Sequence, residues 1–331
     1  MSLKTIFIIT VATYRMIFPG LSPVVPQPGT EVPRPPVTKS LTMELYSDRP
    51  ADAQCKAEVT APSGLKLDGP AKLFIDLKRK VSSSAPASKP GTAEEVFINK
   101  AYWGCSETVP EGQPKITKSN ETGNNNASAE DRNINSLPSN SYAFWPGPDS
   151  KPLHENAATP GIYTLVTNYC GNTSVTLEQE QNFLDTIELI NVPKKADLDK
   201  AIKVTWKPVP NALAYVVNAY GGSGNVSVDW TSGSDPAAIA NIEVRPVSKE
   251  EITKLIEKKA LLPPEVTSCT IPAGIFKGSW SVFLTVTAIG ADKVEMKNGI
   301  ETRVLVRSVV SVPLAGTTYK PMPDENEEKN E

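Results

Sequence analysis

The chain has 331 residues, enough for about two domains that each bury a core, and 30 of them are proline, nearly double the usual share. Its formal charge of −3 offers no electrostatic surface for nucleic acid, and its single histidine excludes sites that need two imidazoles. Because proline disrupts helix interiors and favours turns, this composition predicts an all-β fold with many loops.

The first twenty residues resemble a secretory signal segment. Lys4 precedes the apolar run 5–13, which is too short to cross a bilayer as a helix. Arg15 interrupts the run and no A-x-A cleavage site follows, so an uncleaved N-terminal strand is the alternative. We expect residues 1–20 to direct export, and the protein to be secreted or held in the cell envelope without being an integral membrane protein.

Two further segments lack the pattern of a folded core. Residues 21–37 are rich in proline and are predicted to form an extended, semi-rigid linker. Residues 316–331 are polar and acidic, which predicts a disordered tail. The folded part of the chain should therefore lie between residues 38 and 315.

Residues 38–190 are predicted to form a β-sandwich domain. Short runs of β-forming residues recur between Pro/Gly turns, at 41–46, 53–60, 71–77, 95–103 and 161–170. A long loop rich in Asn and Ser, about 118–140, interrupts them. No Gly-rich loop follows a strand and opens a helix, so nothing indicates a nucleotide cofactor.

An aromatic cluster follows that long loop. Tyr142, Phe144 and Trp145 stand in a Pro/Gly-rich setting and could stack on sugar rings or on a partner protein. The alternative is that these side chains fill one end of the sandwich core. His154, nine residues after Trp145, is expected to be an exposed loop residue and not a catalytic base.

The four cysteines are Cys55, Cys105, Cys170 and Cys269, and their spacing contains no C-x-x-C pair. A structural zinc site or a thioredoxin-like redox pair is therefore not indicated. An even count fits disulfides in an oxidising compartment, and buried free thiols are the alternative. Cys105 with Cys170 is the first expected pair, and Cys55 with either of them is the second.

Residues 191–315 resemble a fibronectin type III domain. The resemblance rests on Trp206, a Pro-x-Pro-Asn-Ala turn and Tyr215-Val-Val within residues 202–220. An Ile-Pro-Ala-Gly turn at 271–274 and the strands expected at 280–290 and 302–312 extend it. It implies a second, immunoglobulin-like β-sandwich.

A short helix is predicted inside this second domain. Ser248 and Glu251 have the spacing of a capping box, and Ile252, Leu255 and Ile256 are spaced for one helical face. We expect the helix to pack across an edge or open end of the sandwich, with a partner-binding helix as the alternative.

These features predict two β-sandwich domains in a non-catalytic extracytoplasmic protein for adhesion or cell-surface scaffolding. Its expected partner is a protein or glycan at the cell surface, and self-assembly is compatible with the fold. We predict no catalytic, metal-binding or cofactor-binding residues. The alternative is a secreted glycan-active enzyme with an accessory fibronectin III-like domain, which would need two carboxylates about 5 to 10 Å apart.

Overall fold

The computed structural model describes residues 3–17, 37–77, 96–119, 137–138, 140–148, 150–190 and 196–315. Residues 21–36 of the predicted linker, most of the Asn/Ser-rich loop and the acidic tail lie outside these ranges. Strands dominate the described residues, which contain one α-helix. The predicted all-β fold is therefore confirmed.

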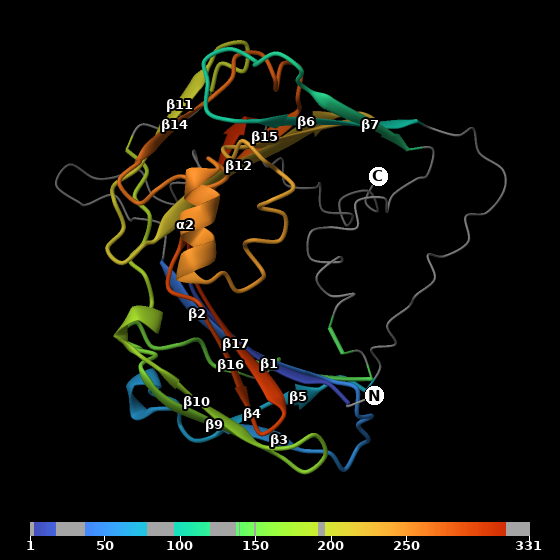
Figure 1. The fold of residues 1–331 in the computed structure, drawn as a ribbon, viewed down its shortest axis with the longest axis vertical. Helices are drawn as coiled ribbons and strands as arrows, with labels where there is room; N and C mark the ends of the chain where they lie inside the picture. Colours follow the sequence, from blue (N-terminus) through green and yellow to red (C-terminus); the bar gives the residue numbers. More distant parts are fainter. Residues whose placement is uncertain are drawn as a thin grey trace, which may run out of the picture.

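An eleven-stranded sheet runs through the whole molecule (Figure 1). Its strands follow the order β5, β8, β2, β1, β17, β15, β12, β13, β6, β7, and β16 pairs separately with β17. Their bounds are β1 (Thr5–Met16), β2 (Thr38–Ser47), β5 (Phe74–Ile75), β6 (Phe97–Trp103), β7 (Lys115–Ser119), β8 (Ser141–Trp145), β12 (Ala214–Ser223), β13 (Val226–Thr231), β15 (Ser281–Ile289), β16 (Lys293–Lys297) and β17 (Ile300–Ala315).

Two smaller sheets complete the fold and lie at opposite ends of the molecule in Figure 1. One has the order β10, β9, β3, β4, and the other pairs β11 with β14. One continuous hydrophobic cluster joins both small sheets to the same side of the long sheet, which we call its inner face. The bounds are β3 (Ala57–Thr60), β4 (Ala71–Lys72), β9 (Gly161–Thr167), β10 (Thr173–Leu177), β11 (Ile202–Thr205) and β14 (Ser268–Ile271).

The apolar run predicted as the centre of a signal segment forms β1. This strand pairs antiparallel with β2 and parallel with β17. Phe7 and Ile9 join the inner-face core, and Ile6 and Ile8 are buried on the opposite side, the outer face. A strand buried on both faces needs continuous rather than alternating hydrophobicity, which accounts for the run.

Strand pairing crosses the predicted domain boundary at residue 190. β6, from the predicted first domain, pairs in parallel with β13 of the second, and β17 pairs with β1 along residues 300–311. The physical reason is the length of β17, which pairs with β16 in its first part and with β15 in its second. The predicted two-domain arrangement is therefore not confirmed.

The predicted helix is confirmed as α2 (Lys249–Glu257), with Ser248 as its N-cap accepting from the backbone N–H of Glu251. Ile252 and Leu255 are buried in a cluster that includes Ala214 and Val216 of β12. The helix thus packs on the outer face of the long sheet. This corrects the expectation that it would cover a sheet edge or an open end.

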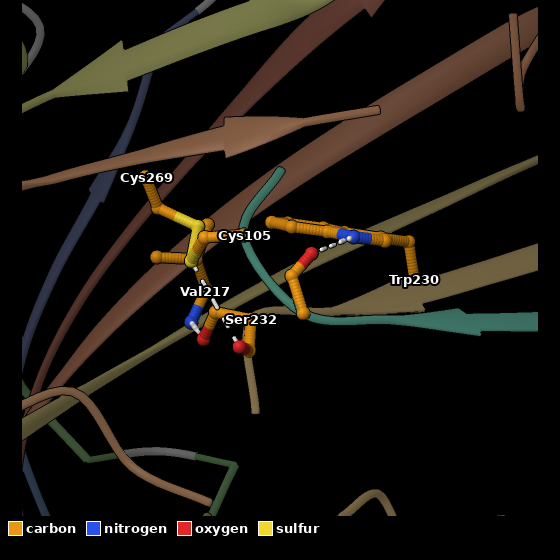
Figure 2. Close-up of a disulfide and its surroundings, with 6 residues drawn as sticks. Cys105, Val217, Trp230, Ser232 and Cys269 are labelled. Atoms are coloured by element: carbon orange, nitrogen blue, oxygen red, sulfur yellow. Dashed lines mark hydrogen bonds between the residues drawn. A yellow bond between two sulfur atoms is a disulfide. The ribbon is translucent and has the colours of Figure 1, made fainter. Parts of the chain in front are cut away.

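The prediction of a disulfide is confirmed, but the expected pairing of Cys105 with Cys170 is wrong. Cys105 is bonded to Cys269 (Figure 2). Cys55 and Cys170 have free thiols. The reason is the pairing of β6 with β13, which carries Cys105 toward the two-stranded sheet that contains Cys269 in β14. The indole N–H of Trp230 fixes this turn by donating to the carbonyl oxygen of Gly104, 3.1 Å away.

Candidate binding groove

The outer face of the long sheet carries a groove of about 600 Å³. Strands β12, β13 and β15, with the end of β6, form its floor. Its wall is the loop of residues 236–244, which folds back over the sheet. We call this site the outer-face groove.

Two exposed aromatic rings lie on the floor of the groove. Tyr220 of β12 and Phe283 of β15 are direct cross-strand partners, and their exposed fractions are 53% and 39%. Strand alternation puts them on the outer face, because their neighbours Ala219 and Leu284 belong to the inner-face core. The floor therefore offers an aromatic surface, flanked by Asn218 one row further along β12.

Asp229 is the cross-strand neighbour of Tyr220 on β13, and it also lines the groove. The side-chain amide of Asn99 donates to its carboxylate. Burial raises the pKa of Asp229, and the hydrogen bond from Asn99 opposes this effect only in part. An ionised carboxylate at this position is therefore stabilised less by the protein than it would be by water.

Asp229→Asn should therefore make the protein more stable at pH 7. The pKa of Asp229 is higher in the folded state than in the unfolded state. The cost of burying its ionised carboxylate therefore appears as the pH rises from the unfolded pKa to the folded pKa, and it is absent below about pH 4. Urea unfolding at pH 7 and pH 3 should show a higher midpoint for the variant only at pH 7. Asp68→Asn, at an exposed turn, is the control and should not differ from wild type by more than about 0.5 kcal/mol. An unchanged or lower midpoint for Asp229→Asn at pH 7 would contradict the account.

Glu243 projects from the wall and connects the groove to a second hollow. Its carboxylate accepts from the amide of Asn218 at 3.0 Å and from the hydroxyl of Thr287 at 3.2 Å. The second hollow, about 360 Å³, shares Glu243 and extends over β1, β2 and β17. Burial, and then the charge of Glu243, raise the pKa of Tyr14 in this hollow, while Arg307 opposes them.

A buried ion pair fixes the wall onto the sheet. Arg307 of β17 donates to Asp292 at 2.6 and 2.9 Å, and its Nη2 also donates to the carbonyl oxygens of Ile242 and Arg245. The second carboxylate oxygen of Asp292 accepts from the backbone N–H of Val247 at 2.9 Å. The bonds to Ile242, Arg245 and Val247 reach the wall or the segment directly after it, so the groove is preorganised.

Packing also holds the wall in place. Ile239 and Ile242 are buried against Ala214 and Val216 of β12. Before the wall, the chain passes very close to the end of α2: a Cβ atom at Gly233 would lie 2.3 Å from the carbonyl oxygen of Ala260. Only glycine allows this approach, so Gly233 is required where the chain passes α2 before the wall.

The predicted aromatic surface is divided between the two faces of the sheet. Trp145 is 8% exposed and joins the inner-face core, as the alternative interpretation expected. Tyr142 and Phe144 lie together on the other face with ring centroids 5.5 Å apart, and Phe74 packs edge-on to Phe144 at 5.4 Å. Strands β2, β1 and β17 separate this cluster from β15, the nearest strand of the groove floor.

Other expected features lie apart from the groove. His154 is exposed, and its Nδ1 accepts from the backbone N–H of Asn156 at 3.1 Å. Sequence reasoning missed Tyr220, Phe283 and Glu243. Strand alternation could have placed Tyr220 on the exposed face of β12. Glu243 has no local sequence signal, because its position depends on how the loop of residues 236–244 folds back.

Comparison of the chain with protein families, with curated proteins and with solved structures finds no match. Within the described ranges, no group of three or more His, Cys, Asp or Glu side chains could hold a metal ion. No helix in the part of the chain that the structure describes is long and apolar enough to span a membrane. The function therefore has to be argued from the groove itself.

Proposed function

We propose that this chain is a non-catalytic binding protein that acts outside the cytoplasm, and that the outer-face groove binds a glycan. The observation that carries the proposal is the exposed pair Tyr220 and Phe283 beside the polar groups of Asn218 and Asp229. Aromatic rings offer flat apolar surfaces to the C–H faces of sugars, and amides and carboxylates bond their hydroxyls. Few of the other lining side chains carry charge.

The topology supports a fibronectin III-like domain as part of this proposal. In immunoglobulin-type sandwiches, strands C, F and G form one sheet, and strands B and E lie in the other. Strands β12, β15 and β17 are adjacent in that order in the long sheet, and β11 pairs with β14 in the sheet that faces it. Domains of this type are common in cell-surface proteins.

The disulfide supports a location outside the cytoplasm. Cys105 and Cys269 are 164 residues apart and join the long sheet to a separate two-stranded sheet. Bonds of this structural type persist mainly in oxidising compartments. Adhesion or scaffolding at the cell surface is the role that we propose there.

A glycan array with the full-length chain tests the proposal. We expect wild type to bind at least one class of glycan, and Tyr220→Ala and Phe283→Ala each to weaken that binding about tenfold or more, since a stacked ring contributes about 1 kcal/mol or more beyond its buried area. Phe74→Ala is the matched control, because Phe74 is an exposed ring on the same sheet outside the groove. Binding lost in Phe74→Ala and kept in the two groove variants would move the site to the Tyr142–Phe144 cluster.

A second candidate function is a glycan-active enzyme, and one observation favours it. Asp229 and Glu243 line the same groove in different environments, one with a pKa raised by burial and the other exposed on the wall. A carboxyl group whose pKa is raised by burial can serve as the acid in glycoside hydrolysis, with a second carboxylate as the base. Incubation of bound oligosaccharides with the protein, followed by mass spectrometry of the products, should show no cleavage. Cleavage that disappears in Asp229→Asn would favour the enzyme.

A further inference from the structure

The charged side chains that line the outer-face groove, among the described residues, are all negative. The described residues that line it include the carboxylates of Asp229 and Glu243 and no Lys, Arg or His. Glu243 is bonded only to neutral donors in the described contacts, the amide of Asn218 and the hydroxyl of Thr287. A cleft lined by charges of one sign concentrates ligands of the opposite sign.

Asp229 can accept further hydrogen bonds from a ligand. Its carboxylate lines the groove beside Tyr220. The only donor to Asp229 in the described contacts is the amide of Asn99. A carboxylate can accept several hydrogen bonds through its two oxygens, so a ligand that carries N–H donors can bond Asp229 in the groove.

The aromatic floor suits a cation as well as a sugar ring. Tyr220 and Phe283 expose ring surface beside Asp229, and an ammonium group over such a ring is attracted by its negative face. An ammonium group has three donors and no acceptor, so it can reach a carboxylate and neutral oxygens together. A bare metal ion is a poorer occupant, because the groove provides two carboxylates and no third charged or imidazole ligand among its described residues.

We propose that the outer-face groove selects glycans that carry free, positively charged amines, that is, oligosaccharides of non-acetylated hexosamine. This inference rests on the proposed glycan-binding function and names its ligand class. Acetylation of the amine removes its charge and leaves only one N–H donor, so the acetylated sugar loses the contact with Asp229 and Glu243. An acidic sugar is repelled by the same two carboxylates.

Isothermal titration of the full-length chain with three oligosaccharides of equal length tests the inference. The probes are an oligomer of β-1,4-linked glucosamine, the same oligomer fully N-acetylated, and an oligogalacturonate. We expect the amine-bearing oligomer to bind about tenfold tighter than the acetylated one, because a charge-assisted hydrogen bond is roughly twice as strong as a neutral one. Its affinity should also fall as salt is added, and the oligogalacturonate should be the weakest ligand.

Charge-removing variants test the residues. Asp229→Asn and Glu243→Gln keep the shape of each side chain. Each should weaken binding of the amine-bearing oligomer several-fold and leave the affinity for the acetylated oligomer unchanged. Glu257→Gln on the exposed side of α2 makes the same change in net charge away from the groove and should have no effect. Circular dichroism and thermal unfolding of each variant establish that it is folded.

The outcomes separate the inference from the function on which it rests. Equal or tighter binding of the acetylated oligomer or of the oligogalacturonate, weakened by Tyr220→Ala, overturns the preference for amines and keeps the glycan groove. Amine-dependent binding that Asp229→Asn and Glu243→Gln leave intact also overturns the inference. If none of the three probes binds and the glycan array is blank, the proposed function fails as well.

Discussion

Removal of residues 1–17 should abolish folding. The deletion removes β1, which pairs with β2 on one side and with β17 on the other. Ile6, Phe7, Ile9 and Val11 are each 0% exposed, and burial of four such side chains contributes about 6–12 kcal/mol. That amount is comparable with the whole stability of a typical protein, about 5–15 kcal/mol. Far-UV circular dichroism and urea unfolding should show no cooperative transition.

A shorter truncation provides the control for this deletion. A chain that begins at Lys4 retains all of β1, including the pairing of Thr5 with Ser47 and Ile300, and should unfold at the wild-type midpoint. If the chain lacking residues 1–17 unfolded as cooperatively as wild type, β1 would not be a structural strand. That result would return the apolar run to the role of a removable signal segment.

Arg307→Ala should lower the free energy of unfolding by about 3–5 kcal/mol, because it leaves the buried carboxylate of Asp292 without its charged partner. It also removes the donors to the carbonyl oxygens of Ile242 and Arg245. Since those bonds hold the segment that forms the wall, the variant should also weaken glycan binding. Urea unfolding and titration with the array ligand measure the two effects.

Two further variants make this prediction specific. Replacing both partners, as in Arg307→Met with Asp292→Leu, should recover much of the lost stability, because no buried charge is then left unpaired. Lys207→Ala removes one partner of an exposed ion pair, with Glu188 at 2.6 Å, and should cost less than about 1 kcal/mol. If Arg307→Ala and Lys207→Ala lowered the free energy of unfolding equally, the Arg307–Asp292 pair would have no special structural role.

Local patterns in the sequence predicted the elements that depend on near neighbours. The alternation of Ile202 and Val204, the cap at Ser248 and the buried stripe of Ile252 and Leu255 are all found in the structure. Each of these signals is complete within one strand or one helical turn. Strand identity and helix position along the chain were therefore predictable.

Long-range pairings had no such signal. The run in β1 fits a signal segment and a doubly buried strand equally well, and only its pairing with β17, about 295 residues away, separates the two. The partner of Cys105 likewise depends on the parallel pairing of β6 with β13. Because spacing does not specify which strands become neighbours, the division into two domains was drawn where the sequence motifs change.

The groove was predictable only in part. Asp229 and Tyr220 lie in strands that the sequence indicates, and alternation assigns them to the side opposite the core. Glu243 reaches the same site through a loop that the Arg307–Asp292 pair fixes, and those two residues are 15 positions apart, Arg307 in β17 and Asp292 just before β16. The composition of the groove therefore follows from tertiary contacts and not from a motif.

Hydrogen exchange measured by mass spectrometry, with and without the glycan that binds best on the array, tests the central claim most directly. We predict slower exchange in the strands Ala214–Ser223, Val226–Thr231 and Ser281–Ile289 and in the wall, residues 236–244. Exchange elsewhere should be unchanged. Protection centred instead on residues 65–74, 147–148 and 150–154, which line a separate hollow of about 1000 Å³, would contradict the claim that the outer-face groove is the binding site. The absence of protection in the groove strands would contradict it as well.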